Sequence, residues 1–231
     1  PVIFEDEAAG EFFNNLLVRN ISFYPPVETD KEDLLKYYYD IPKLVDRIGK
    51  RIMPSFISVE DNPLEKEYNG FGLAGYYPVD DEGIKPYNLK LVENGVLKNI
   101  YSTRKQSKYS KKSNGHARSD FNMYPFAISG NVFIKSNKKI SYKDLISRAS
   151  DIAKENGSDE ILFIKKISKG FSDEILGRPV IAYLMNINTG KKRYISSSSA
   201  FDGISLRALR DILYTEDNDF VYNFVQIGPF Y

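Results

Sequence analysis

Few residues of this 231-residue chain could carry out acid-base or metal chemistry, because it has one histidine, His116, and no cysteine. A two-histidine metal site, a relay of two histidines and a thiolate nucleophile are therefore excluded within the chain. The groups that remain are carboxylates and cations. Their numbers nearly balance, at 31 Asp and Glu against 32 Lys and Arg, so the net charge of +1 gives no overall attraction to nucleic acid or to an anionic membrane.

Three carboxylates stand close together near the start of the chain, at Asp6, Glu7 and Glu11. In a helix, residues five apart such as Asp6 and Glu11 lie roughly 140° apart around the axis and do not share a face. A hard cation could use three carboxylates, whereas a zinc peptidase needs imidazole or thiolate ligands and a carboxylate that activates water. The alternative is an acidic first turn that faces solvent and suits the helix dipole.

A basic loop, residues 104–118, mixes cations with aromatic rings. It carries Arg104, Lys105, Lys108, Lys111, Lys112, His116 and Arg118, with Tyr101, Tyr109 and Phe121 beside or among them. Such a mixture can bind phosphates and stack on bases, but it is also typical of a solvated lysine-rich loop.

Within this loop, Asn114, His116 and Arg118 are candidate substrate-binding residues, since they could orient a carboxylate or carbonyl group. The alternative is a surface histidine without such a role. Residues 80–83, Asp-Asp-Glu-Gly, could likewise hold a cation or form a polar turn.

The elements that must position these residues are predicted from hydrophobic period and turn chemistry. Apolar pairs repeat every four residues and predict a helix over 6–19. Further helices are predicted over 30–38, 42–53, 141–156 and 206–214. Strands are predicted over 56–60, 71–79, 127–134, 161–167, 180–187, 193–196 and 220–225, with a hairpin turn at Asn94-Gly95 and a long loop over 102–122.

This order of elements predicts an α+β fold, with a mostly antiparallel β-sheet or a partly closed barrel and several flanking helices, over residues 1–231. No run of about 18 apolar residues predicts a membrane span, and no signal peptide precedes the first helix. The chain begins at Pro1, and we expect it to be a piece of a longer protein, which leaves open whether that protein is cytoplasmic or exported.

Four motifs in sequence resemble the C-terminal domain of the TldD/PmbA family, described as metalloproteases and as modulators of DNA gyrase. They are residues 79–84 (VDDEGI), 91–98 (LVENGVLK), 114–118 (NGHAR) and 131–134 (NVFI). The resemblance implies that the family's separate N-terminal domain is absent from this chain.

Active members of the family carry an HExxxH helix, in which two histidines bind zinc and the glutamate is the general base. Residues 6–11 match this helix: Asp6 and Glu11 stand at the two histidine positions, and Glu7 matches the base. The family's further cysteine ligand has no counterpart. The resemblance therefore implies zinc in active members and no metal at Asp6 and Glu11 here.

The resemblance leaves three hypotheses. PmbA-like members also lack the zinc helix, so this domain could be a non-catalytic partner subunit that helps bind and process peptides, as a homodimer or as a heterodimer with a TldD-like subunit. It could instead be an active metallopeptidase, with Glu7 as base and an atypical or trans-completed metal site. The third hypothesis is a nucleic-acid-associated module that uses residues 104–118, although the near-neutral charge gives little reason to expect such a partner.

Overall fold

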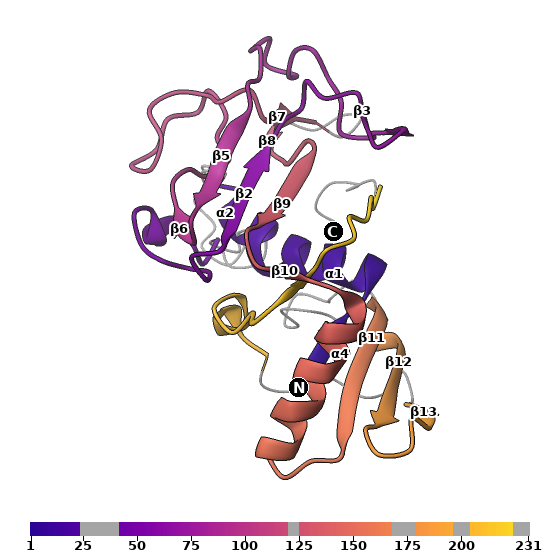
Figure 1. Cartoon of the computed structure of the whole chain (residues 1–231). Helices are drawn as coiled ribbons and strands as arrows, with labels where there is room; N and C mark the ends of the chain where they lie inside the picture. The colour runs from indigo at the N-terminus through magenta and orange to yellow at the C-terminus, as the bar shows by residue number, and fades with distance from the viewer. Residues whose placement is uncertain (24–41, 120–124, 168–178, 196–203, 224–231) are drawn as a thin grey trace. The chain divides into compact units, whose positions relative to one another are not determined.

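The computed structural model describes residues 1–23, 42–119, 125–167, 179–195 and 204–223 (Figure 1). The chain divides into two compact units. The first comprises residues 1–17 and 136–222, and the second comprises residues 18–135 together with the segment from residue 223. Both mix helices with mainly antiparallel strands, which confirms the α+β class.

The first unit contains a four-stranded sheet in the order β1-β11-β12-β13, with β1 parallel to β11 and the other pairs antiparallel. Its strands are β1 (Val2–Phe4), β11 (Glu160–Ile167), β12 (Pro179–Asn186) and β13 (Lys192–Tyr194). Helices α1 (Asp6–Phe13) and α4 (Tyr142–Glu155) both contact β11. The remaining elements are the parallel pair β10 (Lys139–Ile140) and β14 (Thr215–Glu216), and the 3-10 helix η3 (Leu206–Leu209).

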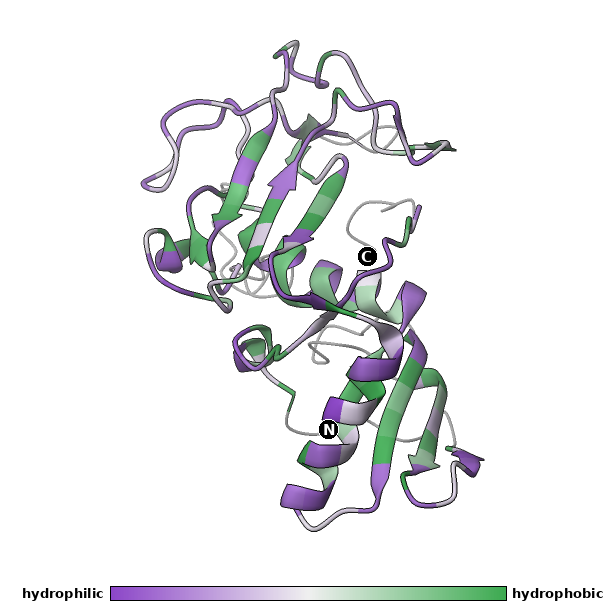
Figure 2. Ribbon diagram, viewed as in Figure 1, coloured by the Kyte–Doolittle hydropathy of each residue, from purple (hydrophilic) through white to green (hydrophobic). Residues whose placement is uncertain are grey.

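The core of the first unit lies between α4 and one face of this sheet. Two alanines of α4, Ala149 and Ala153, let the helix approach the apolar side chains of the strands closely. Phe163 of β11 stacks on Tyr183 of β12, with ring centroids 4.8 Å apart. In Figure 2, β11 is largely hydrophobic, and the side of α4 that faces away from the sheet is polar. Ser141 begins α4 by accepting a hydrogen bond from the Asp144 backbone nitrogen.

The second unit contains a four-stranded sheet in the order β6-β5-β2-β9. Its strands are β2 (Ile57–Asp61), β5 (Leu89–Glu93), β6 (Val96–Leu97) and β9 (Val132–Ser136). Two short ladders join β3 (Glu67–Tyr68) to β4 (Phe71–Gly72) and β7 (Ala117–Arg118) to β8 (Phe126–Ala127). Short helical turns are α2 (Arg19–Ile21) and η2 (Val45–Arg47), and the π-helical segment η1 (Asn14–Val18) connects α1 to α2.

The described strands form separate open sheets, so a partly closed barrel is not confirmed. The predicted first helix, the hairpin, the helix after Ser141 and the strands over 56–60, 161–167 and 180–187 are confirmed, with bounds shifted by one or a few residues. The helix predicted over 30–38 lies outside the described residues. Within these residues, every helix is too short or too polar to span a bilayer.

The helix predicted over 42–53 is wrong, since only the single turn η2 forms there. Gly49, with φ of +80°, ends that turn. The backbone beyond it pairs with the hairpin instead of continuing a helix, because the nitrogens of Ile52 and Met53 both donate to the carbonyl of Gly95. Tertiary pairing has overridden the apolar spacing of this segment.

The strand predicted over 71–79 is also wrong beyond the two residues of β4. The backbone nitrogens of Gly75 and Tyr77 donate to the Asn131 side chain and to the carbonyl of Pro63, so they do not enter a ladder. The strand predicted over 127–134 is divided into β8 and β9. The helix predicted over 206–214 shortens to η3, and residues 220–223 form no strand.

The hairpin between β5 and β6 turns at Asn94 and Gly95, whose φ angles of +48° and +77° are those of a type I′ turn. The turn is pressed against the backbone of the segment before β2. A Cβ atom on Gly95 would lie 2.2 Å from the Met53 carbonyl oxygen. The other Asn-Gly hairpin, at Asn69 and Gly70, has similar φ angles of +51° and +80°, but a Cβ on Gly70 would meet nothing within 4 Å.

We expect Gly95→Ala to lower the free energy of unfolding by more than Gly70→Ala does. Both substitutions force alanine into left-handed backbone, at a cost of about 1–2 kcal/mol, but only Gly95→Ala also drives a methyl group into a backbone carbonyl. Urea unfolding of the two variants measures the difference. Equal losses would show that the close approach at Gly95 does not exist in solution.

Candidate functional site

The predicted catalytic helix is α1 of the first unit. It follows β1 directly, and the Glu5 nitrogen continues the pairing by donating to the carbonyl of Ile164. Asp6 begins the helix with a left-handed φ of +45° and is exposed. Glu7 and Glu11 are four residues apart and therefore share a face. The structure brings together Glu7 and Glu11.

A tyrosine from the other end of the chain covers this face. The Tyr222 hydroxyl lies 3.0 Å from Glu11 Oε1 and 3.4 Å from Glu7 Oε1. Its ring rests on Gly10, where a Cβ atom would come within 2.6 Å of Tyr222 Cδ1. Glycine at position 10 therefore makes room for the ring. We call Glu7, Glu11 and Tyr222 the carboxylate cluster.

Within the described residues, hydrogen-bond donors and a cation contact the carboxylate oxygens of this cluster. Lys166 Nζ lies 3.2 Å from Glu7 Oε1, and the Asn15 side chain donates to Glu11 Oε2 at 3.3 Å. Burial, followed by the charges of Glu11 and Glu7, raises the pKa of Tyr222, so its hydroxyl keeps the proton that it donates. Glu11 is only 7% exposed and depends on these donors.

These residues do not fit the zinc site that the resemblance implies for active members of the family. A peptidase zinc site needs three protein ligands around the metal and one open position. Here Glu7 and Glu11 are engaged with Tyr222, Lys166 and Asn15, and Asp6 is exposed at the strained start of the helix. The described residues contain no group of three or more His, Cys, Asp or Glu side chains placed to hold a metal.

A second acidic contact supports the start of α1. The Tyr142 hydroxyl donates to Glu5 Oε1 at 2.6 Å, and Lys165 Nζ lies 3.4 Å from Glu5 Oε2. Burial, followed by Glu5, raises the pKa of Tyr142. Burial and the neighbouring charges, Asp217 first, raise the pKa of Glu216. The side chains around the start of α1 are therefore mostly acidic, and Lys165 and Lys166 of β11 lie beside them.

In the second unit, Asn114 and His116 are enclosed rather than presented to solvent. The Asn114 side chain supports backbone, donating to the Ile100 carbonyl at 2.8 Å and accepting from the Ser102 nitrogen at 3.1 Å. His116 Nδ1 lies 3.0 Å from the Asn114 carbonyl oxygen. The two residues belong to one buried network.

Arg118 lies nearer the surface, with 38% of its side chain exposed. Its guanidinium stacks 4.4 Å above the Tyr77 ring, and Nε is 3.3 Å from Asp81 Oδ1. Burial alone would raise the pKa of Asp81, but hydrogen bonds from Ser119 and the charge of Arg118 lower it below the usual value. Arg118 is thus the predicted substrate residue of this loop that a ligand could reach.

The predicted polar turn at residues 80–83 is confirmed, and Asp80 is its centre. Its carboxylate accepts hydrogen bonds from the backbone nitrogens of Glu82, Ile84 and Ala117, at 2.7–3.1 Å. Three backbone donors satisfy this carboxylate without a cation.

The basic loop exposes its cations but uses its aromatic rings internally. Exposed side chains are those of Arg104, Lys105, Lys108, Lys111 and Lys112. Tyr109 packs edge-on against Phe23 and donates to Asp46 at 2.6 Å, while Tyr101 is fully buried. Phe121 lies outside the described residues. Tyr101 therefore offers no free face for stacking on a base, and Tyr109 is already engaged with Phe23 and Asp46.

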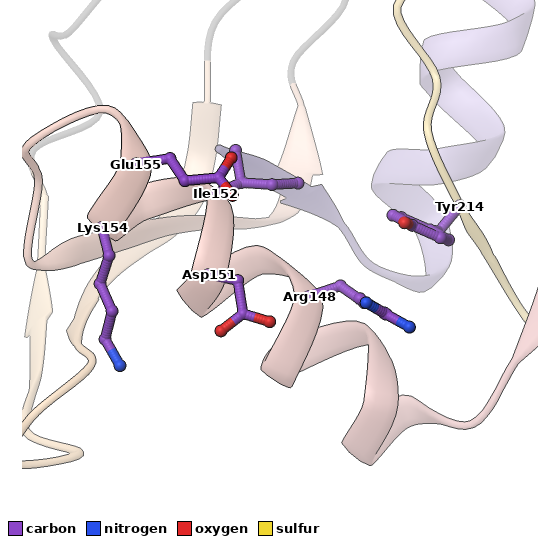
Figure 3. A pocket seen from close by; sticks show the side chains of 6 residues that line it. All are labelled: Arg148, Asp151, Ile152, Lys154, Glu155 and Tyr214. Atoms are coloured by element: carbon purple, nitrogen blue, oxygen red, sulfur yellow. The ribbon is translucent and has the colours of Figure 1, made fainter.

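A hollow of about 490 Å³ lies along α4 in the first unit (Figure 3). Charged side chains of α4 and the Tyr214 ring line it, namely Arg148, Asp151, Ile152, Lys154, Glu155 and Tyr214. It contains none of the predicted site residues, and its mixed charges are those of a solvated helix surface.

Sequence reasoning missed Tyr222, Lys166 and Tyr142, the partners of the helix carboxylates. The Lys165-Lys166 pair within an apolar strand was a usable signal, because two adjacent cations in such a strand call for acidic partners, here Glu5 and Glu7. Tyr222 gave no such signal, since it is more than 200 residues from Glu7. Asp61, which contacts His116, was also missed. It occupies the next inward-facing position of β2 after Ile57 and Val59, where a buried apolar residue is usual.

The chain has relatives among curated proteins and families. Residues 1–212 match the PmbA/TldA metallopeptidase C-terminal domain. A protein of Archaeoglobus fulgidus, named Metalloprotease, is 27% identical over 108 residues, which cover 47% of this chain and 24% of that protein. Another Metalloprotease, from Methanothermobacter thermautotrophicus, is 30% identical over 104 residues, or 45% of this chain and 21% of that protein. The matched parts span about a quarter or less of these relatives.

Two solved structures share the fold. TldE from Thermococcus kodakarensis aligns with a TM-score of 0.52 and 21% identity, over 83% of this chain and 38% of that one. A candidate modulator of a DNA gyrase from Thermotoga maritima aligns with a TM-score of 0.62 and 18% identity, over 96% of this chain and 45% of that one. Because the family match runs from residue 1 to residue 212, the chain belongs to the PmbA/TldA metallopeptidase family, of which it contains the C-terminal domain.

Proposed function

We propose that this domain is a non-catalytic, PmbA-like subunit that helps bind and process peptides together with a TldD-like partner. The observation that carries the proposal is the Tyr222 hydroxyl seated on Glu7 and Glu11, the positions of the general base and of one zinc ligand in active members. Gly10 makes room for the ring, and Lys166 neutralises Glu7. A general base must be free to take a proton from water, and Glu7 is instead held by a cation and a phenol.

The alternative is an active metallopeptidase with Glu7 as base and a metal completed in trans. It requires Lys166 and Tyr222 to leave Glu7 when the partner binds. A nucleic-acid role draws support from the exposed cations of the basic loop, but of the two described tyrosines beside those cations, Tyr101 is buried and Tyr109 packs against Phe23. We therefore do not propose it.

The first prediction concerns metal content. We expect the purified chain, equilibrated with zinc and then desalted, to retain far less than one equivalent by elemental analysis, because no imidazole or thiolate lies at the carboxylate cluster. One equivalent of zinc that Asp6→Ala removes, and that the exposed control Glu67→Gln keeps, would contradict the proposal.

The second prediction concerns the Tyr222 hydroxyl. Tyr222→Phe removes the donor to the buried Glu11 carboxylate and should lower the free energy of unfolding by about 1 kcal/mol. Tyr194→Phe is the matched control, because Tyr194 is 71% exposed and its loss of a hydroxyl should be nearly neutral. If urea unfolding gives the two variants the same stability as the parent, Tyr222 does not close the cluster in solution.

The third prediction concerns peptide hydrolysis in a mixture with a TldD-like subunit that has an intact HExxxH helix. We expect no hydrolysis by this chain alone. With the partner present, Glu7→Gln should leave the turnover number within about twofold, since a residue without a role in the chemical step contributes nothing to the barrier. Loss of turnover by orders of magnitude in Glu7→Gln, but not in Glu67→Gln, would instead identify Glu7 as the base.

A further inference from the structure

His116 and Asp61 form an enclosed pair whose contacts specify how many protons it holds. Both side chains are 0% exposed, and His116 Nε2 lies 3.6 Å from Asp61 Oδ1. Among the described residues, neither of these two atoms has a hydrogen-bond partner. Asp61 ends β2, and His116 directly precedes β7.

The other ring nitrogen of His116 must carry a proton. Nδ1 lies 3.0 Å from the Asn114 carbonyl oxygen, which can only accept a hydrogen bond. A neutral ring would then leave Nε2 bare. Its lone pair would face a carboxylate oxygen at a site closed to bulk solvent, and an arrangement of two facing acceptors leaves both unsatisfied.

The Asp61 carboxylate has the contacts of an anion. Its Oδ2 accepts from the Tyr101 hydroxyl and from the Gly130 nitrogen, each at 2.8 Å. Burial, followed by the charge of Asp61, raises the pKa of Tyr101, so the phenol keeps the proton it donates. Two donors to one oxygen of a carboxylate favour its ionised form.

From this geometry we propose that His116 is an imidazolium in the folded protein, and that its Nε2 proton lies toward Asp61 Oδ1 as the charge partner of that buried carboxylate. The pair then holds one proton and has no net charge. It joins β2 to the segment before β7, and through Tyr101 and Gly130 to two further loops.

Other charged and titratable groups lie around the pair. Each of them makes its contacts elsewhere than at Asp61 Oδ1. The Tyr101 ring lies 5.1 Å from the imidazole. The Tyr77 hydroxyl donates to the Gly115 carbonyl, and burial raises the pKa of Tyr77, with Asp61 the next cause. Arg118 is paired with Asp81 above the Tyr77 ring.

Asp80, on the other side of this network, is satisfied by backbone nitrogens. We therefore assign the proton that faces Asp61 Oδ1 to Nε2 of His116.

The proton count predicts how folding depends on pH. In an unfolded chain, histidine loses its second proton above about pH 6.5 and aspartate gains one below about pH 3.9. Above pH 6.5 the folded state thus holds one proton more than the unfolded state, so stability falls as pH rises until the folded pair also loses its proton. Below pH 3.9 the unfolded state holds more protons, so stability falls on acidification as well.

Nuclear magnetic resonance of the intact chain tests the proposal directly, because His116 is the sole histidine and needs no assignment. At about pH 7.5, one unit above the reference value for histidine, we expect both imidazole ¹⁵N nuclei to have the chemical shifts of protonated nitrogens. A shift of one nitrogen to the value of a bare imidazole nitrogen at that pH would overturn the proposal.

Urea unfolding across pH provides the second test. Relative to His116→Gln, the ratio of folded to unfolded parent protein should fall tenfold per pH unit above about pH 6.5, or about 1.4 kcal/mol. The variant cancels the contributions of all other titrating groups. Parallel pH profiles would overturn the proposal.

Asp61→Asn serves as a third arm, because it removes the anion and keeps the side-chain shape. It should return the ring to its neutral form at about pH 7.5. If the histidine spectrum stays that of an imidazolium in this variant, Asp61 is not its partner. The spectra of the parent chain decide the question even if either variant fails to fold.

Discussion

A carboxylate enclosed in protein needs donors for its oxygens, and much of the second unit is arranged to supply them to two aspartates. Asp61 gathers the Tyr101 hydroxyl, the Gly130 nitrogen and the His116 ring. Asp80 gathers three backbone nitrogens from its own turn and from Ala117. Removing either carboxylate would leave several donors from distant segments buried without a partner.

The same principle explains how this unit orders long stretches with little regular structure. Asn114 supports the backbone at Ile100 and Ser102, and Asn131 accepts from Gly75 and donates to the Glu65 carbonyl. Side-chain amides and carboxylates here do the work that ladder hydrogen bonds do in a sheet. In the first unit, by contrast, polar side chains gather at one end of α1, where Tyr222 and Lys166 meet the helix carboxylates.

The extent to which sequence predicted this structure follows from how local each signal is. The Asn94-Gly95 hairpin and the helix capped by Ser141 depend on neighbouring residues, and both are confirmed. The segment 42–53 failed because its backbone donors go to Gly95, a contact that no local pattern records. The family resemblance predicted that α1 is the site helix. It could not show that Tyr222 covers this helix, since that contact joins residues from opposite ends of the chain.

The hairpin turn also affects the rate at which this protein is modified by deamidation. Asn-Gly sequences deamidate when the glycine backbone nitrogen attacks the asparagine side chain and closes a five-membered succinimide ring. After Asn94 this nitrogen is not free to attack, because the Gly95 N–H donates a hydrogen bond to the Ile57 carbonyl at 2.8 Å. The bond that ties the turn to β2 therefore also slows conversion of Asn94 to aspartate and isoaspartate.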